Sequence, residues 1–117
     1  MRTLMQTYVK DRAQAIDAYL RAFDAKLTHV DYADDGTMVH CEIDVKGQVL
    51  AVGEVAEPVT GTTMQFCFQF DSPEDVARAY RELEEGATIF HAMGPCFFSP
   101  CMADIIDRFG VRWCLFV

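Results

Sequence analysis

The spacing of apolar residues predicts two amphipathic helices, over residues 12–23 and 73–84. In both segments apolar residues recur three and four positions apart, which places them on one side of a helix. Asp11 and Ser72 precede the segments, and side chains of these types cap the first turn of a helix. The buried side of the second helix is expected to carry Val76, Ala77, Tyr80 and Leu83.

Shorter runs of alternating or continuous apolar residues predict eight strands. The clearest is 37–45, where apolar residues alternate with His40, Glu42 and Asp44, so that one face is apolar and the other polar. Lys46-Gly47 then predicts a two-residue turn that pairs Val45 with Gln48. The expected strands are 4–9, 27–32, 37–45, 48–53, 64–70, 88–91, 102–106 and 111–117, with an irregular segment at 93–101.

The order of these elements is β-α-β-β-β, used twice, with an internal offset of 61 residues in the sequence. A half-length repeat indicates two copies of one supersecondary unit. The order does not fit a doubly wound parallel fold, which needs strands and helices to alternate. We therefore expect a single α+β domain over 1–117, with one module at about 1–57 and the other at about 62–117.

Charge and cysteine content restrict the partners and the compartment. The 117 residues include 18 acidic and 10 basic side chains, for a net charge of −8, which disfavours nucleic acid and anionic membranes as partners. No apolar run is long enough to span a bilayer. The five cysteines are an odd number with no secretion signal, so we expect a cytoplasmic protein without a disulfide framework.

Three stretches resemble the PhnB-like branch of the vicinal oxygen chelate superfamily, which includes glyoxalases, dioxygenases and bleomycin and fosfomycin resistance proteins. They are YVKDRAQAIDAYLRAFDAKL, MVHCEIDVKGQVLAVGE and the closing DRFGVRWCLFV. The resemblance implies two βαβββ modules that form an open, cup-like mixed sheet with helices on the convex face. It also implies a homodimer and a small-molecule ligand of unknown identity on the concave face, within one chain or across the dimer.

Enzymes of this superfamily commonly hold a divalent metal with one ligand from each of four strands. The positions that correspond here are Leu4, Ala51, Gln65 and Cys114. Leu and Ala cannot bind a metal, and Gln and Cys are a poor set for an oxygen-chelating centre. We therefore expect no metal at these positions and no cofactor.

The alternation in each strand also predicts which side chains line the cup. The apolar set, which includes Phe66, Phe68 and Trp113, should lie under the helices, and the opposite set should face the ligand. The proposed ligand-binding pocket consists of Gln6, Tyr8, His40, Glu42, Gln65, Cys67, Gln69, Arg112 and Cys114.

Single side chains in this set have two interpretations. His40 with Glu42 is either a base with its orienting carboxylate or a polar strand face. Arg112 either binds an anionic ligand or pairs with Glu42 or another acid. Cys67 and Cys114 are the thiols most open to reaction, whereas Cys96 and Cys101 have a spacing typical of neither a metal nor a redox motif.

The sequence is compatible with three functions, with or without a catalysed reaction. The first is a protein that binds a small polar or amphiphilic molecule in the cup, without the metal tetrad. The second is a divergent lyase or isomerase of the glyoxalase kind that holds a metal with other residues. The third is a drug-sequestering module like the bleomycin resistance proteins.

Overall fold

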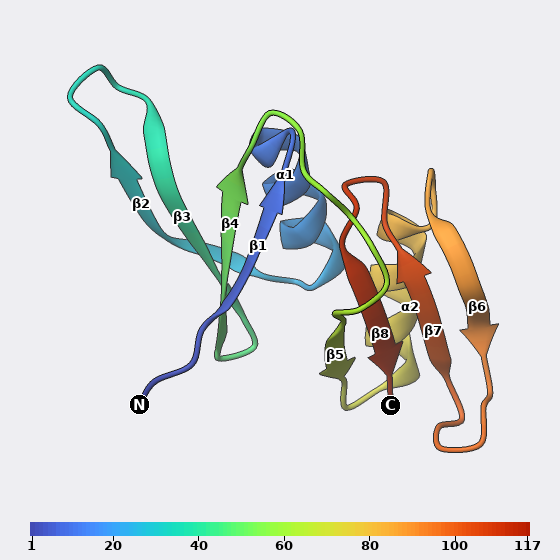
Figure 1. Cartoon of the computed structure of the whole chain (residues 1–117). Coiled ribbons are helices and arrows are strands. Elements are labelled where there is room, and N and C mark those ends of the chain that lie inside the picture. The colour runs from blue at the N-terminus through green and yellow to red at the C-terminus, as the bar shows by residue number, and fades with distance from the viewer. The chain divides into compact units, whose positions relative to one another are not determined.

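A computed structural model describes residues 1–117 and contains two compact units, Met1–Pro58 and Val59–Val117 (Figure 1). Both units have the predicted order βαβββ. The first unit comprises β1 (Met5–Val9), α1 (Arg12–Ala22), β2 (Lys26–Tyr32), β3 (Met38–Val45) and β4 (Gln48–Glu54). The second comprises β5 (Phe66–Gln69), α2 (Pro73–Leu83), β6 (Thr88–Gly94), β7 (Met102–Ile106) and β8 (Arg112–Phe116).

The two sheets have the same topology, which confirms the predicted α+β modules. The strand order is β1-β4-β3-β2 in the first sheet and β5-β8-β7-β6 in the second. In each sheet the first and last strands of the module pair in parallel, and the other pairs are antiparallel. A parallel pair needs a crossover, which the helix and the two following strands provide.

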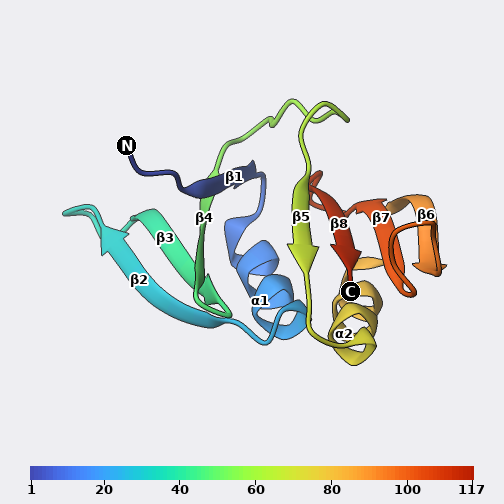
Figure 2. The same ribbon diagram turned by 90° about the horizontal axis from the view of Figure 1, so that it is seen from below.

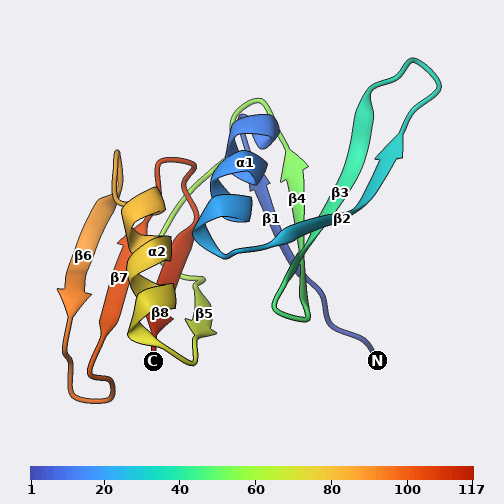
Figure 3. The same ribbon diagram turned by 180° about the vertical axis from the view of Figure 1, so that it is seen from behind.

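Each helix lies across one face of its own sheet (Figures 2 and 3). We call the other face of each sheet the open face. α1 begins where predicted, because the Asp11 carboxylate accepts a hydrogen bond from the Gln14 backbone N–H. The Glu54 carboxylate accepts a second one from the Arg12 N–H at 3.1 Å, so two of the N–H groups that a helix start leaves unpaired are satisfied. Neither α1 nor α2 has the length and hydrophobicity that crossing a bilayer requires.

α2 also begins as predicted, with Ser72 as N-cap and Pro73 in the first turn. Its buried residues correct one prediction, because Ala79 is fully buried whereas Ala77 is only half-buried. Residues three and four positions apart share a helix face, and α2 is rotated so that the buried line runs through 76, 79, 80 and 83 rather than through 77.

The apolar sides of the strands form the cores under the helices, as the alternation predicts. Ile43, Leu50 and Val52 are buried in the first unit, and Ile105, Trp113 and Leu115 in the second. Phe66 and Phe68 lie on the same side as Trp113, with ring centroids 5.3 and 5.1 Å from its ring. Both phenylalanines are half-buried, so they form the margin of the second core rather than its centre.

The turn between β3 and β4 sets the register of the first sheet. Lys46 and Gly47 have φ angles of 50° and 87°, which two-residue hairpin turns of type I′ require. Val45 pairs with Gln48 and Ile43 with Leu50, as predicted. This register puts Leu50 and Val52 under α1 and leaves Glu54 exposed at the end of β4.

Only β7 has both limits as predicted, and the other strands differ from the prediction by one to three residues, most of all β5 and β6. β5 covers only Phe66–Gln69 rather than 64–70, because β8 pairs with those four residues alone. β6 continues to Gly94 instead of ending at 91, through two shifts in its pairing with β7. β8 begins at Arg112 rather than at 111, since residue 111 belongs to the turn that precedes it.

That turn is built around Asp107, a buried carboxylate. Its Oδ1 accepts hydrogen bonds from the backbone N–H groups of Phe109 and Val111, at 2.9 and 3.0 Å. Its Oδ2 accepts one from the Trp113 indole N–H at 2.7 Å. The turn, the start of β8 and the largest core residue therefore depend on one side chain.

Candidate functional site

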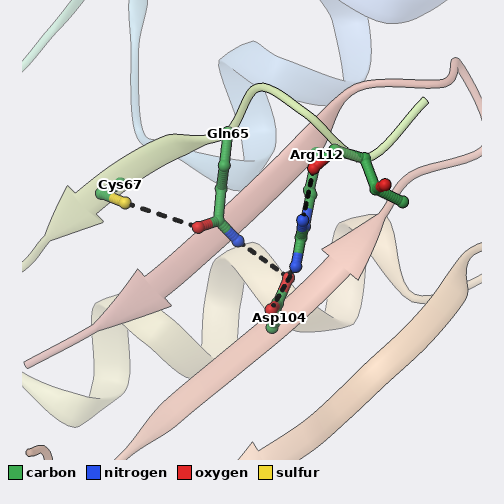
Figure 4. A network of polar contacts seen from close by, with 5 residues as sticks. Gln65, Cys67, Asp104 and Arg112 are labelled. Carbon is green, nitrogen blue, oxygen red and sulfur yellow. Dashed lines mark hydrogen bonds and ion pairs between the residues drawn. The ribbon is translucent and has the colours of Figure 1, made fainter. Parts of the chain in front are cut away.

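Asp104, on β7, is the centre of a polar network on the open face of the second sheet (Figure 4). Its Oδ1 accepts from Gln65 Nε2 at 2.8 Å and from Arg112 Nε at 3.2 Å. Its Oδ2 accepts from Arg112 Nη2 at 3.0 Å. Arg112 and Asp104 thus form a bidentate ion pair, the geometry that best suits a guanidinium and a carboxylate.

The Arg112 side chain is held on two further sides. Its Nη1 donates to the Thr62 carbonyl oxygen at 2.7 Å, and its guanidinium lies 4.9 Å from the centre of the Phe90 ring. The hydrogen bond with Asp104 raises the pKa of Arg112, so the group stays charged. The acid that pairs with Arg112 in this unit is Asp104, which the sequence did not single out.

Two thiols lie beside this network. Cys67 on β5 and Cys114 on β8 are register partners in the parallel pair, so their side chains project from the same face of the sheet. The Cys67 thiol donates to Gln65 Oε1 at 3.7 Å. The pKa of Cys114 is raised to about 11, chiefly by burial and to a smaller extent by the charge of Cys67. Cys114 is therefore a neutral thiol at neutral pH.

The open face of the first sheet carries a second polar group. Ala51 on β4 is the register partner of both Gln6 on β1 and Glu42 on β3, which places all three on this face. His40 Nε2 lies 3.1 Å from Glu42 Oε1. Next to them, the Tyr8 ring packs on Gly53 so closely that an added Cβ would come within 2.6 Å of two ring carbons.

His29 and Asp31 on β2 extend this group, although the alternation along the strand does not predict them as site residues. His29 Nε2 lies 2.9 Å from Asp31 Oδ1, and the His29 ring centroid is 6.1 Å from that of His40. Across the strand pair, His29 is opposite Glu42 and Asp31 is opposite His40. Two imidazoles and two carboxylates thus form a square on this face.

A bulge explains why alternation did not reveal this square. The pairing of β2 with β3 shifts by one residue between Leu27 and His29, and an extra residue in a strand exchanges the faces of the residues that follow it. β6 has a corresponding shift between Ile89 and His91. The bulge at Phe90 allows its ring to reach Arg112 on the open face.

The structure brings together the predicted site residues within each unit. Gln65, Cys67, Arg112 and Cys114 are neighbours on the second sheet, and Gln69 is an exposed residue farther along β5. Gln6, Tyr8, His40 and Glu42 share the open face of the first sheet. That all nine side chains contribute to one ligand site stays a prediction.

The residues at the four metal positions that the resemblance implies do not fit a metal ion. Leu4 and Ala51 have no donor atom. The Gln65 amide already donates to Asp104 and accepts from Cys67, and a thiol must lose its proton to bind a metal, which the raised pKa of Cys114 opposes. Glu54, the carboxylate nearest to these positions in sequence, caps the start of α1.

The remaining cysteines lie in other surroundings. Cys41 is fully buried under α1, where burial raises its pKa. Cys96 and Cys101 flank a turn in which the Cys96 N–H donates to the Ser99 carbonyl oxygen at 2.9 Å. All five cysteines are free thiols.

Comparison with solved structures shows the same fold in several proteins. A PhnB protein from Bacillus cereus aligns with a TM-score of 0.81 and 19% identity, over 99% of this chain and 98% of that one. Protein PA1353 from Pseudomonas aeruginosa aligns with a TM-score of 0.82 and 20% identity, over 99% and 96%. The fosfomycin resistance protein FosX from Listeria monocytogenes, in a complex with Mn(II), gives 0.73 and 14%, over 99% and 88%.

Comparisons of sequence identify the family. The uncharacterized protein Rv0887c of Mycobacterium tuberculosis is 28% identical over 116 residues, which cover 92% of this chain and 68% of the relative. The sequence model of one superfamily matches residues 4–115, nearly the whole chain. The chain belongs to the Glyoxalase/Bleomycin resistance protein/Dioxygenase superfamily.

Proposed function

We propose that this protein binds a small polar or amphiphilic molecule on the open faces of its sheets, without the metal tetrad of the superfamily. The observation that carries the proposal is the network around Asp104, where an amide, a guanidinium and two thiols are fixed beside one another on a face that no helix covers. Such convergent polar groups beside aromatic rings are typical of small-molecule sites.

The chemistry of this face favours a ligand with an anionic or carbonyl group. Arg112 donates three of its N–H groups to Asp104 and Thr62, and a guanidinium has five. The remaining N–H donors belong to a side chain whose conformation is already fixed. Ligand binding would therefore not cost the entropy of ordering that side chain. The exposed Phe90 ring beside the guanidinium offers apolar area to the rest of the ligand.

Binding on the first sheet would use different groups. Gln6 and Tyr8 supply an amide and a phenol, and the paired His40 and Glu42 supply an imidazole and a carboxylate. We propose that these residues position the ligand by hydrogen bonds. The arrangement needs no proton transfer, and catalysis is not part of the proposal.

The test is a fragment screen by nuclear magnetic resonance. Uniformly ¹⁵N-labelled protein is titrated with a library of small carboxylates, phosphonates, amides and aromatic alcohols in the presence of EDTA. We expect one class of fragment to shift the signals of Gln65, Cys67, Arg112 and Cys114, together with those of Gln6, Tyr8, His40 and Glu42.

The test variant is Arg112→Lys, which keeps the charge but cannot form the bidentate pair. The matched control is Arg78→Lys. Arg78 pairs with Asp75 on α2, away from the open face. The first should weaken the fragment that binds and the second should not. Fragments that shift only residues under the helices, or that bind only after a divalent metal is added, would contradict the proposal.

A further inference from the structure

Cys67 and Cys114 face each other across two hydrogen-bonded parallel strands, with no residue between them. Neighbouring strands in a sheet lie about 4.8 Å apart, and disulfides join residues with Cα atoms about 4.4–6.8 Å apart. Both side chains project from the open face. The backbone therefore already holds the two cysteines at a spacing that a disulfide accepts.

The two sulfurs also interact as free thiols. Cys67 is among the groups that raise the pKa of Cys114, after burial, which is the largest cause. Cys67 in turn donates to Gln65 Oε1. Cys67 thus contacts Gln65 along β5 and is the register partner of Cys114 across the parallel strand pair.

The two cysteines differ in accessibility. Cys67 is exposed, whereas Cys114 is 7% exposed. A small oxidant in solution meets Cys67 first. Cys114 is buried next to Cys67 and can react with the oxidised form of that cysteine. This is the arrangement of an accessible cysteine with an adjacent resolving cysteine.

We propose that Cys67 and Cys114 form a reversible disulfide when the protein meets a hydroperoxide. Cys67 gives up its thiol proton and its sulfur attacks one oxygen of hydrogen peroxide; the O–O bond breaks and the departing hydroxide takes up that proton, which gives Cys67 sulfenic acid and water. The Cys114 sulfur then attacks the Cys67 sulfur, the S–O bond breaks, and the departing hydroxide combines with the Cys114 proton. Two thiols are oxidised, peroxide is reduced and two waters form; a dithiol reductant reverses the change.

The disulfide would change the polar network next to it. A sulfur in a disulfide cannot donate, so Gln65 Oε1 loses the hydrogen bond from Cys67. The Gln65 amide nitrogen still donates to Asp104. The oxidation state of the two cysteines thus reaches the residues around Arg112 through one side-chain amide.

The test is peptide mapping of the full chain after treatment with hydrogen peroxide, without reduction. We expect the intact mass to fall by about 2 Da, the two thiol hydrogens, and to recover with dithiothreitol. The protein should lose two of its five free thiols. One peptide pair should link residue 67 to residue 114.

The variants assign the order of the steps. Cys114→Ser should stop at the sulfenic acid of Cys67, which dimedone traps, and Cys67→Ser should form no disulfide. Cys101→Ser is the matched control, because Cys101 lies outside the network, and should behave like the unchanged protein. A link of Cys114 to Cys96, a link between chains, or oxidation of Cys67 to sulfinic acid without a disulfide would overturn the proposal. Mapping of the unchanged protein gives this answer even if a variant fails to fold.

Discussion

Arg112 and Asp104 lie on adjacent antiparallel strands, and the guanidinium binds both carboxylate oxygens, with Nε 3.2 Å from Oδ1 and Nη2 3.0 Å from Oδ2. About a fifth of each side chain is exposed, 23% and 20%. The pair is therefore shielded more than a surface ion pair, and it joins β7 to β8 on the face that we assign to the ligand.

The pair should stabilise the second unit measurably. Asp104→Ala leaves Arg112 and the Gln65 amide without their common acceptor, so we expect the free energy of unfolding to fall by about 2 kcal/mol. Urea denaturation checks this. Asp17→Ala removes the exposed pair of Asp17 with Arg21 on α1 and should cost at most about 0.5 kcal/mol. Equal effects of the two substitutions would show that the Asp104 pair is no more than a surface contact.

The turn before β8 should depend more strongly on Asp107. In Asp107→Ala the backbone N–H groups of Phe109 and Val111 and the Trp113 indole lose their acceptor. Because these donors are in a buried region, we expect a loss of about 3 kcal/mol or more. Asp107→Asn keeps one acceptor oxygen and should retain part of that stability. Thermal unfolding of both variants measures these losses of stability. An alanine variant as stable as the unchanged protein would contradict the prediction.

The repeat and the faces of most strands could be predicted from the sequence. In β3 apolar residues alternate with His40, Glu42 and Asp44, and in β5 the phenylalanines alternate with Cys67 and Gln69. The type I′ turn at Lys46-Gly47 fixes the register between β3 and β4. Local chemistry determines both features. For the same reason the caps Asp11 and Ser72 mark the starts of the two helices.

The partners on the open faces could not be predicted in this way. His29 reaches the open face only because a bulge follows Leu27, and the alternation of Leu27 and His29 alone would put both on the same side. Asp104 lies in a short apolar strand, and its role depends on β7 lying beside β8. Such roles follow from pairing between strands, which the pattern within one strand does not contain.

The buried thiol of Cys114 should make stability depend on pH. Folding raises its pKa from 9.0 to about 11, so the thiol stabilises the fold while both states are protonated. That stability is lost as the pH rises from about 9 to about 11, where the unfolded chain releases the proton more readily. Urea midpoints across this range should fall less steeply in Cys114→Ala than in the unchanged protein. Parallel curves for the two proteins would show that folding does not raise this pKa.

The most direct test of the central claim, ligand binding without the metal tetrad, is a calorimetric titration of EDTA-treated protein with Mn²⁺, Ni²⁺ and Zn²⁺. Leu4 and Ala51 offer no donor atom, Gln65 already donates to Asp104, and burial raises the pKa of the Cys114 thiol. We predict no ion bound in a one-to-one ratio at these four positions. One ion per chain, with binding lost in both Gln65→Ala and Cys114→Ala, would contradict the account.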